Sequence, residues 1–295
     1  MNTTDFSAKI AAGQGFIAAL DQSGGSSPKT LRAYGVGDDE WDGEEEMFAR
    51  IHEMRARIIA SPALSGDKVL GTILFETTMD GLVAGKPTPQ VLLDKGIAPI
   101  IKIDKGLAAE ENGVQLMNPM PELDALLARA KGLGVYGTKE RSVINSANAQ
   151  GIAAIVAQQF EVASTVLAAG LMPILEPEFT ITAPDRAEGE DMLKAELLKH
   201  LDAMPEGSQV MIKLSLPVKA GLYREVVDHP NCLKVVALSG GFSREQACEQ
   251  LALNTGMIAS FSRATLEGLT AQMSQEEFDA TLGASVDAIC NASRT

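Results

Sequence analysis

Short apolar runs alternate along the whole chain with longer segments in which apolar residues recur at helical spacing. Eight runs have the length and composition of buried strands, and we expect these strands at residues 16–21, 69–75, 98–104, 135–141, 172–178, 210–216, 235–239 and 257–263. The segments between them predict amphipathic helices. Two Ser-x-x-Gln/Glu capping boxes, beginning at Ser243 and Ser274, predict where the last two helices start.

This alternation predicts a single (β/α)8 barrel of the TIM type, which needs eight strands and intervening helices in a chain of about this length. We expect the barrel to form one catalytic domain over residues 1–295, ending in a helical tail. An open, doubly wound α/β sheet is the alternative. That fold usually carries a GxGxxG motif after its first strand, and the segment Asp21-Gln-Ser-Gly-Gly-Ser26 does not match it.

The composition excludes several classes of function. Apolar residues make up 45% and charged residues 22% of the chain, as in soluble globular proteins. A net charge of −14 disfavours binding to nucleic acid or to anionic membranes. The three cysteines are too few and too far apart for a disulfide framework, and the start of the chain does not read as a signal peptide. With no long apolar span recognised either, we expect a cytoplasmic protein.

The histidines also narrow the chemistry. There are three, all isolated, and none forms the HxxxH or HxH pair that commonly holds a transition metal. We therefore expect neither a metal ion nor another cofactor.

Charged and polar residues gather where the predicted strands end, which is where barrels of this kind carry their active sites. These positions are Asp21, Glu76, Lys102 with Asp104, Lys139 with Arg141, Glu176 with Glu178, Lys213, Ser239 and Arg263. Contact with water accounts for one or two charged strand ends, but not for a set spread over seven strands. We therefore predict one active site at this end of the barrel.

Lys213 is the predicted nucleophile, because it lies inside the apolar run 210–216. Burial disfavours the charged form of a lysine, and a neutral amine attacks carbonyl carbons to form a Schiff base. A lysine whose ammonium reaches solvent from a strand end is the common alternative for a single strand, but the other strand ends outweigh it. Lys102 is a weaker candidate, since Asp104 two residues on is expected to favour its charged form.

The neighbouring charges predict how this nucleophile is activated. Residues two apart share a strand face, so Lys139 and Arg141 are expected to point together into the barrel mouth. Their positive charges would keep Lys213 neutral. Carboxylates from Asp21 and Glu176 would then transfer protons.

The last two strand ends predict an anion site. They read Leu-Ser-Gly-Gly and Ser-Phe-Ser-Arg, and the loops after the seventh and eighth strands are the usual phosphate site of this fold. Glycines let backbone N–H groups approach an anion, a helix N-terminus adds partial positive charge, and an arginine binds phosphate through two nitrogens. The predicted phosphate ligands are Ser239, Gly240, Gly241, Ser262 and Arg263.

Together these motifs resemble those of the class I fructose-bisphosphate aldolases, over about residues 15–268. The matching motifs are Ile-Lys102-Ile-Asp104, Lys139-Glu-Arg141, Glu176-Pro-Glu178, Lys213, Ser239-Gly-Gly241 and Phe-Ser-Arg263. The resemblance implies four catalytic residues: Lys213 as Schiff-base nucleophile, Glu176 as principal acid and base, Asp21 in cleavage of the C3–C4 bond, and Lys139 in carbinolamine chemistry. It implies that the C1 phosphate binds at Ser239, Gly240, Gly241 and Arg263, and the far phosphate near Ser26, Lys102 and Arg141.

The tail of the chain departs from the pattern of animal members, which use a mobile C-terminal tyrosine in the later proton transfers. Residues 289–295 contain no tyrosine, and the chain is shorter than theirs. It therefore looks like a compact bacterial branch of the family. We expect Glu176, with water, to protonate the enamine instead.

The resemblance implies metal-independent, reversible cleavage of fructose 1,6-bisphosphate to dihydroxyacetone phosphate and glyceraldehyde 3-phosphate, in glycolysis and gluconeogenesis. Its partners would be small sugar phosphates, without nucleic acid or membrane, and the sequence leaves open a homo-oligomer. Two other classes stay open: another Schiff-base lyase, such as a transaldolase-like enzyme or a keto-acid aldolase, and a non-catalytic sugar-phosphate-binding barrel. Two separate anion sites disfavour the first, and the joint presence of Lys213, Glu176 and Lys139 disfavours the second.

Overall fold

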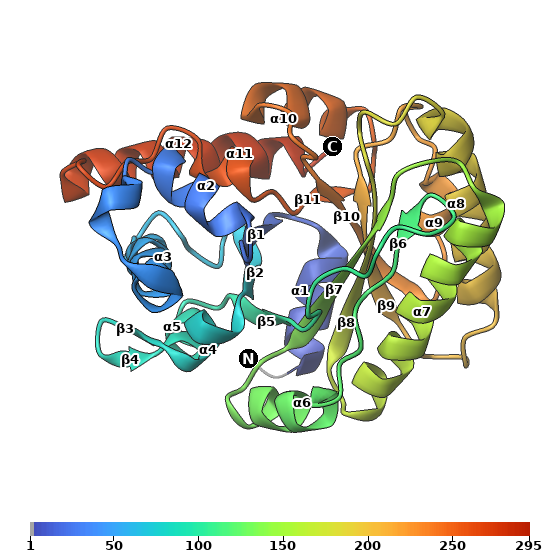
Figure 1. Ribbon diagram of the computed structural model, residues 1–295, viewed down its shortest axis with the longest axis horizontal. Helices are drawn as coiled ribbons and strands as arrows, with labels where there is room; N and C mark the ends of the chain where they lie inside the picture. The colour runs from blue at the N-terminus through green and yellow to red at the C-terminus, as the bar shows by residue number, and fades with distance from the viewer. Residues whose placement is uncertain (1–2) are drawn as a thin grey trace.

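Eight parallel strands form the centre of the molecule, with helices around them (Figure 1). The computed structural model describes residues 3–295. Residues 1–2, at the start of the segment that does not read as a signal peptide, lie outside the described residues. In order around the sheet the strands are β1 Phe16–Leu20, β2 Val69–Leu74, β5 Ala98–Lys102, β7 Gly137–Ile144, β8 Met172–Phe179, β9 Val210–Ser215, β10 Cys232–Leu238 and β11 Ile258–Ala259. All eight predicted strands are confirmed.

The barrel closes between its first and last strands. The backbone N–H of Ala19 in β1 donates to the carbonyl oxygen of Phe261, just after β11, at 3.1 Å. The (β/α)8 barrel is thus confirmed, and the doubly wound sheet is wrong. This seam is short, because β11 spans only two residues and pairs with β10 over those two. Arg263, predicted to end the last strand, instead begins a short helix.

The longer helices alternate with the strands, as the apolar periodicity predicts. They are α3 Gly43–Ala60, α5 Thr88–Asp94, α6 Leu123–Gly132, α7 Ala149–Ala168, α8 Arg186–Asp202, α10 Arg244–Ala252 and α12 Gln275–Ala292. Both predicted capping boxes are present, with Ser243 and Ser274 at the N-caps. Shorter elements complete the chain: α2 Ser26–Ala33, η1 Asp38–Glu40, α4 Glu76–Asp80, a hairpin of β3 Leu82–Val83 and β4 Lys86–Pro87, β6 Val114–Gln115, α9 Arg224–Val227 and α11 Arg263–Leu266.

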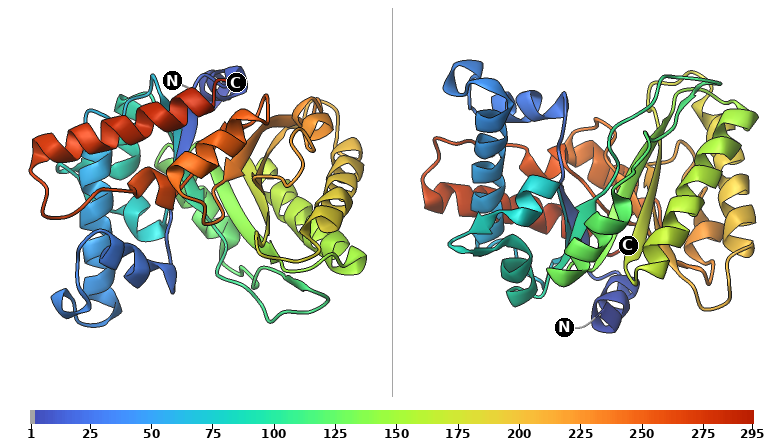
Figure 2. Two further views of the ribbon diagram at one scale, coloured as in Figure 1. Left: turned by 90° about the horizontal axis from the view of Figure 1, so that it is seen from above. Right: turned by 60° about the horizontal axis from the view of Figure 1, so that its bottom comes forward.

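Helix α1, Thr3–Ala12, was not predicted and closes the bottom of the barrel, where the strands begin (Figure 2). Its Phe6 and Ile10 are buried in one apolar cluster with the first inward-facing residues of the strands, among them Ile17 and Met211. Phe6 also packs edge-on against Tyr136, with ring centroids 5.8 Å apart. An open lower end would expose this apolar layer to water, and α1 removes it from solvent.

Among the described residues, helix α7 is the one helix long and apolar enough to cross a membrane by length and composition alone. In this fold it is a barrel helix. Its buried residues, including Ile152, Ile155 and Val156, face β7 and β8. The apolarity of α7 is thus explained by packing on the sheet.

Candidate active site

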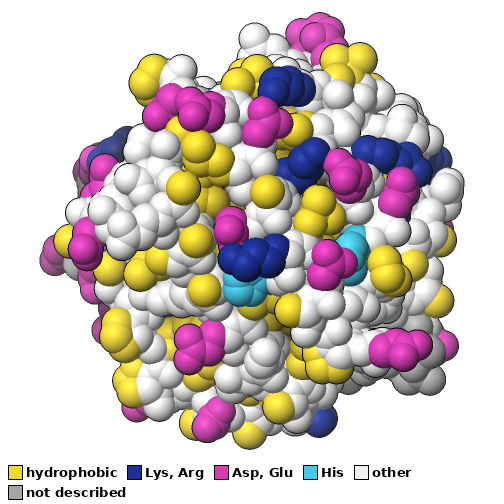
Figure 3. All heavy atoms as spheres, turned by 90° about the vertical axis from the view of Figure 1, so that its right-hand side faces the viewer, with side chains coloured by type: hydrophobic (Ala, Val, Ile, Leu, Met, Phe, Trp, Pro, Cys, Tyr) yellow, Lys and Arg dark blue, Asp and Glu magenta, His cyan; other side chains and the backbone are white. Residues whose placement is uncertain are grey.

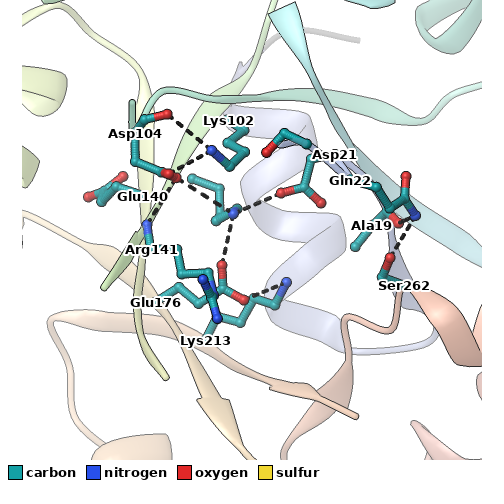
Figure 4. Close-up of polar contacts among 12 residues, drawn as sticks. Ala19, Asp21, Gln22, Lys102, Asp104, Glu140, Arg141, Glu176, Lys213 and Ser262 are labelled. Atoms are coloured by element: carbon teal, nitrogen blue, oxygen red, sulfur yellow. Dashed lines mark hydrogen bonds and ion pairs between the residues drawn. The ribbon is translucent and has the colours of Figure 1, made fainter. Parts of the chain in front are cut away.

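Four of the predicted catalytic residues meet inside the upper end of the barrel (Figure 4). Lys139 on β7 is at their centre, with its side chain 2% exposed. Its Nζ lies 2.7 Å from Oδ2 of Asp21, which follows β1, and 2.9 Å from Oε2 of Glu176 on β8. Lys213 on β9 is equally buried from solvent, and its Nζ lies 2.9 Å from Oε1 of Glu176.

Glu176 therefore links the two lysines, with one carboxylate oxygen toward each. The alternation of β8 points this side chain inward. Its backbone is held from behind, since the N–H of Glu176 donates to Oε1 of Gln159 on α7 at 3.2 Å. Gln159 also donates from Nε2 to the hydroxyl of Ser142 on β7 at 2.7 Å. One buried glutamine thus ties together the two strands that carry Glu176 and Lys139.

A second layer of charge surrounds this centre. Lys102 at the end of β5 donates to Oδ1 of Asp104 at 2.6 Å. The other oxygen of Asp104 accepts from the backbone N–H of Arg141 at 3.2 Å and lies 3.8 Å from Nζ of Lys139. Arg141 turns its own side chain to Glu178, with Nε 2.5 Å from Oε2. Lys102 and Asp104, and likewise Lys139 and Arg141, were predicted to share a strand face, and both pairs lie at the mouth.

The lysines hold the two catalytic carboxylates in their ionised form. Burial by itself would raise the pKa of Asp21 and of Glu176, but the positive charges of Lys139 and Lys213 outweigh it and lower both. Burial would lower the pKa of Lys139, yet its carboxylate neighbours, Asp21 and Glu176 foremost, raise it. Lys139 is thus a cation between two carboxylates whose ionised forms it favours.

Asp104 favours the charged form of Lys102, as expected, through the ion pair at 2.6 Å. Burial, and then the positive charge of Lys139, lower the pKa of Lys102, and the ion pair with Asp104 does not reverse that shift. The sequence predicts a ring of opposed charges around Lys213, with Lys139 and Arg141 acting on its protonation, and the structure shows how these charges pair. Lys139 and Arg141 each have carboxylate partners, and Lys213 itself faces Glu176 from the neighbouring strand.

Glu76 does not join the cluster, although it follows β2 as predicted. It is the first residue of α4 and pairs with Lys105 and Arg129. Together with those two residues and an apolar wall that includes Met120 and Leu126, it lines a separate cavity of about 380 Å³. This cavity lies outside the group of residues around Lys139.

The predicted phosphate residues form a second group beside the cluster. Gly240 and Gly241 have positive φ angles of 60° and 120°, so the backbone turn after β10 requires glycine there. A Cβ at Gly241 would lie 3.4 Å from Nη2 of Arg263, which places that guanidinium against the glycine backbone. Ser239 is buried next to the turn. Ser26 opens α2, is exposed, and exchanges hydrogen bonds with Ser23 within its own loop.

Two neighbours of the site were missed in the sequence. Gln22 follows Asp21 directly and is buried, and its amide reaches Ser262. Arg55 from α3 is fully buried and contacts Gln22. The sequence signal for Arg55 was its place between Met54 and Ile58, two apolar positions on the buried face of the predicted helix.

The described residues also bear on metal binding. Within residues 3–295, no group of three or more His, Cys, Asp or Glu side chains is placed to hold a metal ion. The carboxylates of the mouth face lysines instead.

Comparison with known proteins gives the family. A sequence profile of the class I fructose-bisphosphate aldolases matches residues 4–201, more than half of the chain. Among solved structures, the chain is similar to fructose-bisphosphate aldolase from Plasmodium falciparum in complex with TRAP and a small-molecule inhibitor, with a TM-score of 0.76 and 21% identity over 98% of this chain and 95% of that chain. It is also similar to a Corynebacterium glutamicum protein, with a TM-score of 0.56 and 15% identity over 98% of this chain and 92% of that chain.

These two structural likenesses support the barrel fold, while the profile carries the family assignment. The predicted resemblance is thereby confirmed at the level of the family. The chain belongs to the class I fructose-bisphosphate aldolase family and is a lyase of the aldolase type.

Proposed function

We propose that the protein cleaves fructose 1,6-bisphosphate reversibly to dihydroxyacetone phosphate and glyceraldehyde 3-phosphate, through a Schiff base on Lys213. The observation that carries the proposal is the contact of Glu176 with both Lys213 and Lys139, at 2.9 Å each, in a buried barrel mouth. A nucleophile, a carboxylate that exchanges its protons and a fixed cation lie within hydrogen-bond reach of one another. The reaction would belong to glycolysis and gluconeogenesis.

In the first half of the reaction, the Lys213 amine attacks C2 of the ketose and forms a carbinolamine. Glu176, beside the nitrogen, first accepts a proton from the Lys213 amine and then gives it to the C2 hydroxyl, which leaves as water, and a protonated Schiff base results. Lys139 assists because its charge stabilises the ionised form of Glu176 that remains.

In the second half, Asp21 takes the proton of the C4 hydroxyl, and the C3–C4 bond breaks. The electron pair of that bond moves into the iminium, so that glyceraldehyde 3-phosphate departs and an enamine stays on Lys213. Asp21 passes its proton to solvent, Glu176 takes up a proton from water and gives it to C3, and water then hydrolyses the Schiff base to release dihydroxyacetone phosphate and the free lysine.

The charges around the mouth favour a substrate with two phosphates. Arg263 and the Gly240–Gly241 turn lie at the ends of β10 and β11, and Lys102 and Arg141 lie across the barrel on β5 and β7. The overall charge of the protein is −14, and the face drawn in Figure 3 has acidic, basic and apolar side chains interspersed. A dianion would therefore be attracted by the local group of cations and not by the whole surface. We assign the C1 phosphate to Ser239, Gly240, Gly241, Ser262 and Arg263, and the far phosphate to Lys102 and Arg141, with Ser26 at its edge.

Borohydride reduction tests this proposal. Dihydroxyacetone phosphate with borohydride should inactivate the enzyme irreversibly, and peptide mapping should find the adduct on Lys213. Lys213→Met should abolish trapping and lower kcat/KM at least about a thousandfold, which corresponds to roughly 4 kcal/mol in the barrier. An adduct on Lys102 or Lys139 would refute the assignment of the nucleophile, and loss of activity in EDTA would refute a metal-independent reaction.

A further inference from the structure

Gln22, the residue after Asp21, lies at the seam where the barrel closes and turns its side chain away from Asp21 toward Ser262 (Figure 4). Its amide nitrogen donates to the hydroxyl of Ser262 at 2.6 Å and to the carbonyl oxygen of Ala19 at 3.3 Å. One side chain thus connects the end of β1 with the loop that follows β11. Among the residues that the structure describes, one backbone hydrogen bond, from Ala19 to Phe261, joins the two sides of this seam. The amide of Gln22 is therefore a substantial part of the connection.

Arg55 fixes Gln22 from the outer layer. Its Nη2 donates to the backbone carbonyl of Gln22 at 2.5 Å and lies 3.3 Å from the side-chain oxygen, and its Nη1 donates to Thr78 at 2.9 Å. The guanidinium is 0% exposed, and among the residues that the structure describes no carboxylate lies within 4.0 Å of it. Burial lowers the pKa of Arg55 to about 10, and the charge of Asp21 opposes that shift. An arginine remains a cation at neutral pH under these conditions.

Burying a cation without an ion-pair partner is costly, and its hydrogen bonds must offset that cost. Here they define the conformation of the turn after Asp21 and the orientation of the Gln22 amide. That amide in turn sets the hydroxyl of Ser262, the residue before Arg263. Neither Gln22 nor Arg55 is placed to touch the reacting carbons, so any effect on the reaction passes through Asp21 and Ser262.

We propose that Gln22, held by Arg55, is a positioning residue that fixes the place of the C1-phosphate end of the site relative to Asp21. This inference rests on the proposed function, because it assigns the Ser262–Arg263 segment to the C1 phosphate of the substrate. Gln22 acts by donating to Ser262. Arg55 acts by presenting Gln22 in the only orientation in which that donation and the bond to Ala19 are made together.

Gln22→Glu separates positioning from structural support. An ionised glutamate keeps the size of the side chain and offers Arg55 an anion, but it cannot donate to Ser262 or to Ala19. Dihydroxyacetone phosphate serves as the probe, since its single phosphate occupies the C1 end. We expect its half-saturating concentration in borohydride trapping to rise about tenfold, the loss typical of one hydrogen bond. The trapping rate at saturation should stay within about twofold, and the midpoint of thermal unfolding should not fall.

Two further variants complete the test. Gln209→Glu is the matched control, because this half-buried glutamine also donates to one carbonyl, that of Pro230, just before β9 and far from the mouth; it should leave trapping unchanged. Arg55→Lys keeps a cation but loses the planar fork, and should raise the half-saturating concentration as well. In the double variant with Gln22→Glu the two effects should not add, since both act through one contact.

The outcomes separate the two proposals. An unchanged half-saturating concentration in Gln22→Glu, with normal trapping of the unmodified protein, would overturn the positioning role and leave the proposed function intact. A parallel fall in saturating rate and unfolding temperature would also overturn it, because Gln22 would then be a structural residue. If the unmodified protein formed no adduct, the proposed function would fail, and the positioning role with it.

Discussion

The two ends of the barrel are built on the same strands but filled with opposite chemistry. At the lower end, Ile17 of β1 and Met211 of β9 pack against Phe6 and Ile10 of α1. Further along the same inner faces the residues become charged: Asp21 follows β1, and Lys213 lies two residues after Met211. The change takes two residues on β9, from Met211 to Lys213, and four on β1, from Ile17 to Asp21, which is one or two steps of the period-two alternation.

The contrast separates the source of stability from the source of reactivity. Apolar burial at the lower end stabilises the fold without requiring any particular partner. At the mouth, every buried charge requires an opposite charge, and Lys139 meets this need for both Asp21 and Glu176. Removing one charge from the mouth should therefore lower both stability and activity. Removing one apolar side chain from the lower end should lower only stability.

Lys139→Met tests the mouth and has the largest expected effect. It leaves Asp21 and Glu176 buried without their shared cation, so the free energy of unfolding should fall by about 3–5 kcal/mol. The value of kcat/KM should fall about a thousandfold, within the range of lost acid–base catalysis. Urea unfolding and steady-state kinetics measure the two effects.

The matched control is Lys199→Met, an exposed lysine in a surface ion pair with Glu196. Surface pairs contribute little, so stability should change by less than about 1 kcal/mol. Equal destabilisation by the two substitutions would contradict the view of the mouth as an interdependent charge cluster.

Phe6→Ala tests the lower end. It removes a buried aromatic ring from the apolar cluster and should lower the free energy of unfolding by about 3–5 kcal/mol. Because the cluster lies at the other end of the strands, kcat/KM should stay within about twofold at temperatures where the protein is folded. A large fall in kcat/KM with little loss of stability would show that the two ends are coupled.

Arg263→Ala sharpens the comparison within the mouth, since it removes a cation of the phosphate group and leaves the lysine cluster in place. Loss of a charged, bidentate contact should raise the KM for fructose 1,6-bisphosphate by an amount equivalent to about 2–3 kcal/mol. Arg224→Ala, which breaks an exposed helix pair with Asp228, is the control and should leave KM unchanged. Unaltered kinetics in Arg263→Ala would remove this residue from the site.

The pH dependence of stability should show the smallest effect. The folded pKa of Asp21 lies below its ordinary value of 3.8, so its ionised form stabilises the folded state. That contribution is fully present above the unfolded pKa and is lost as pH falls toward the folded pKa. The difference in unfolding free energy between the protein and Asp21→Asn should therefore be largest near neutral pH and should narrow below about pH 4. A difference that stays constant from pH 7 to pH 3 would contradict the lowered pKa.

Much of this architecture was predictable because local patterns set it. The eight apolar runs and two capping boxes predicted the barrel, and the strand ends predicted Lys139, Glu176 and Lys213 as neighbours. Boundaries were less predictable where loops decide them: Glu76 begins a helix and pairs away from the mouth with Lys105 and Arg129. Helix α1 was missed because its Phe6 and Ile10 form a short apolar face, and its partners are seven or more residues away along the chain.

The sequence by itself determined the order of elements and which residue types reach the mouth, because both follow from periodicity and from strand direction. Only the tertiary structure decided which charges pair. Lys102 and Asp104 are two residues apart and form an ion pair, yet burial and the charge of Lys139, from the neighbouring strand, lower the pKa of Lys102. The contact of Arg55 with Gln22 joins residues 33 positions apart, and that of Gln22 with Ser262 joins residues 240 apart. Such contacts depend on strand register and barrel closure, which packing of the whole chain fixes and no local pattern encodes.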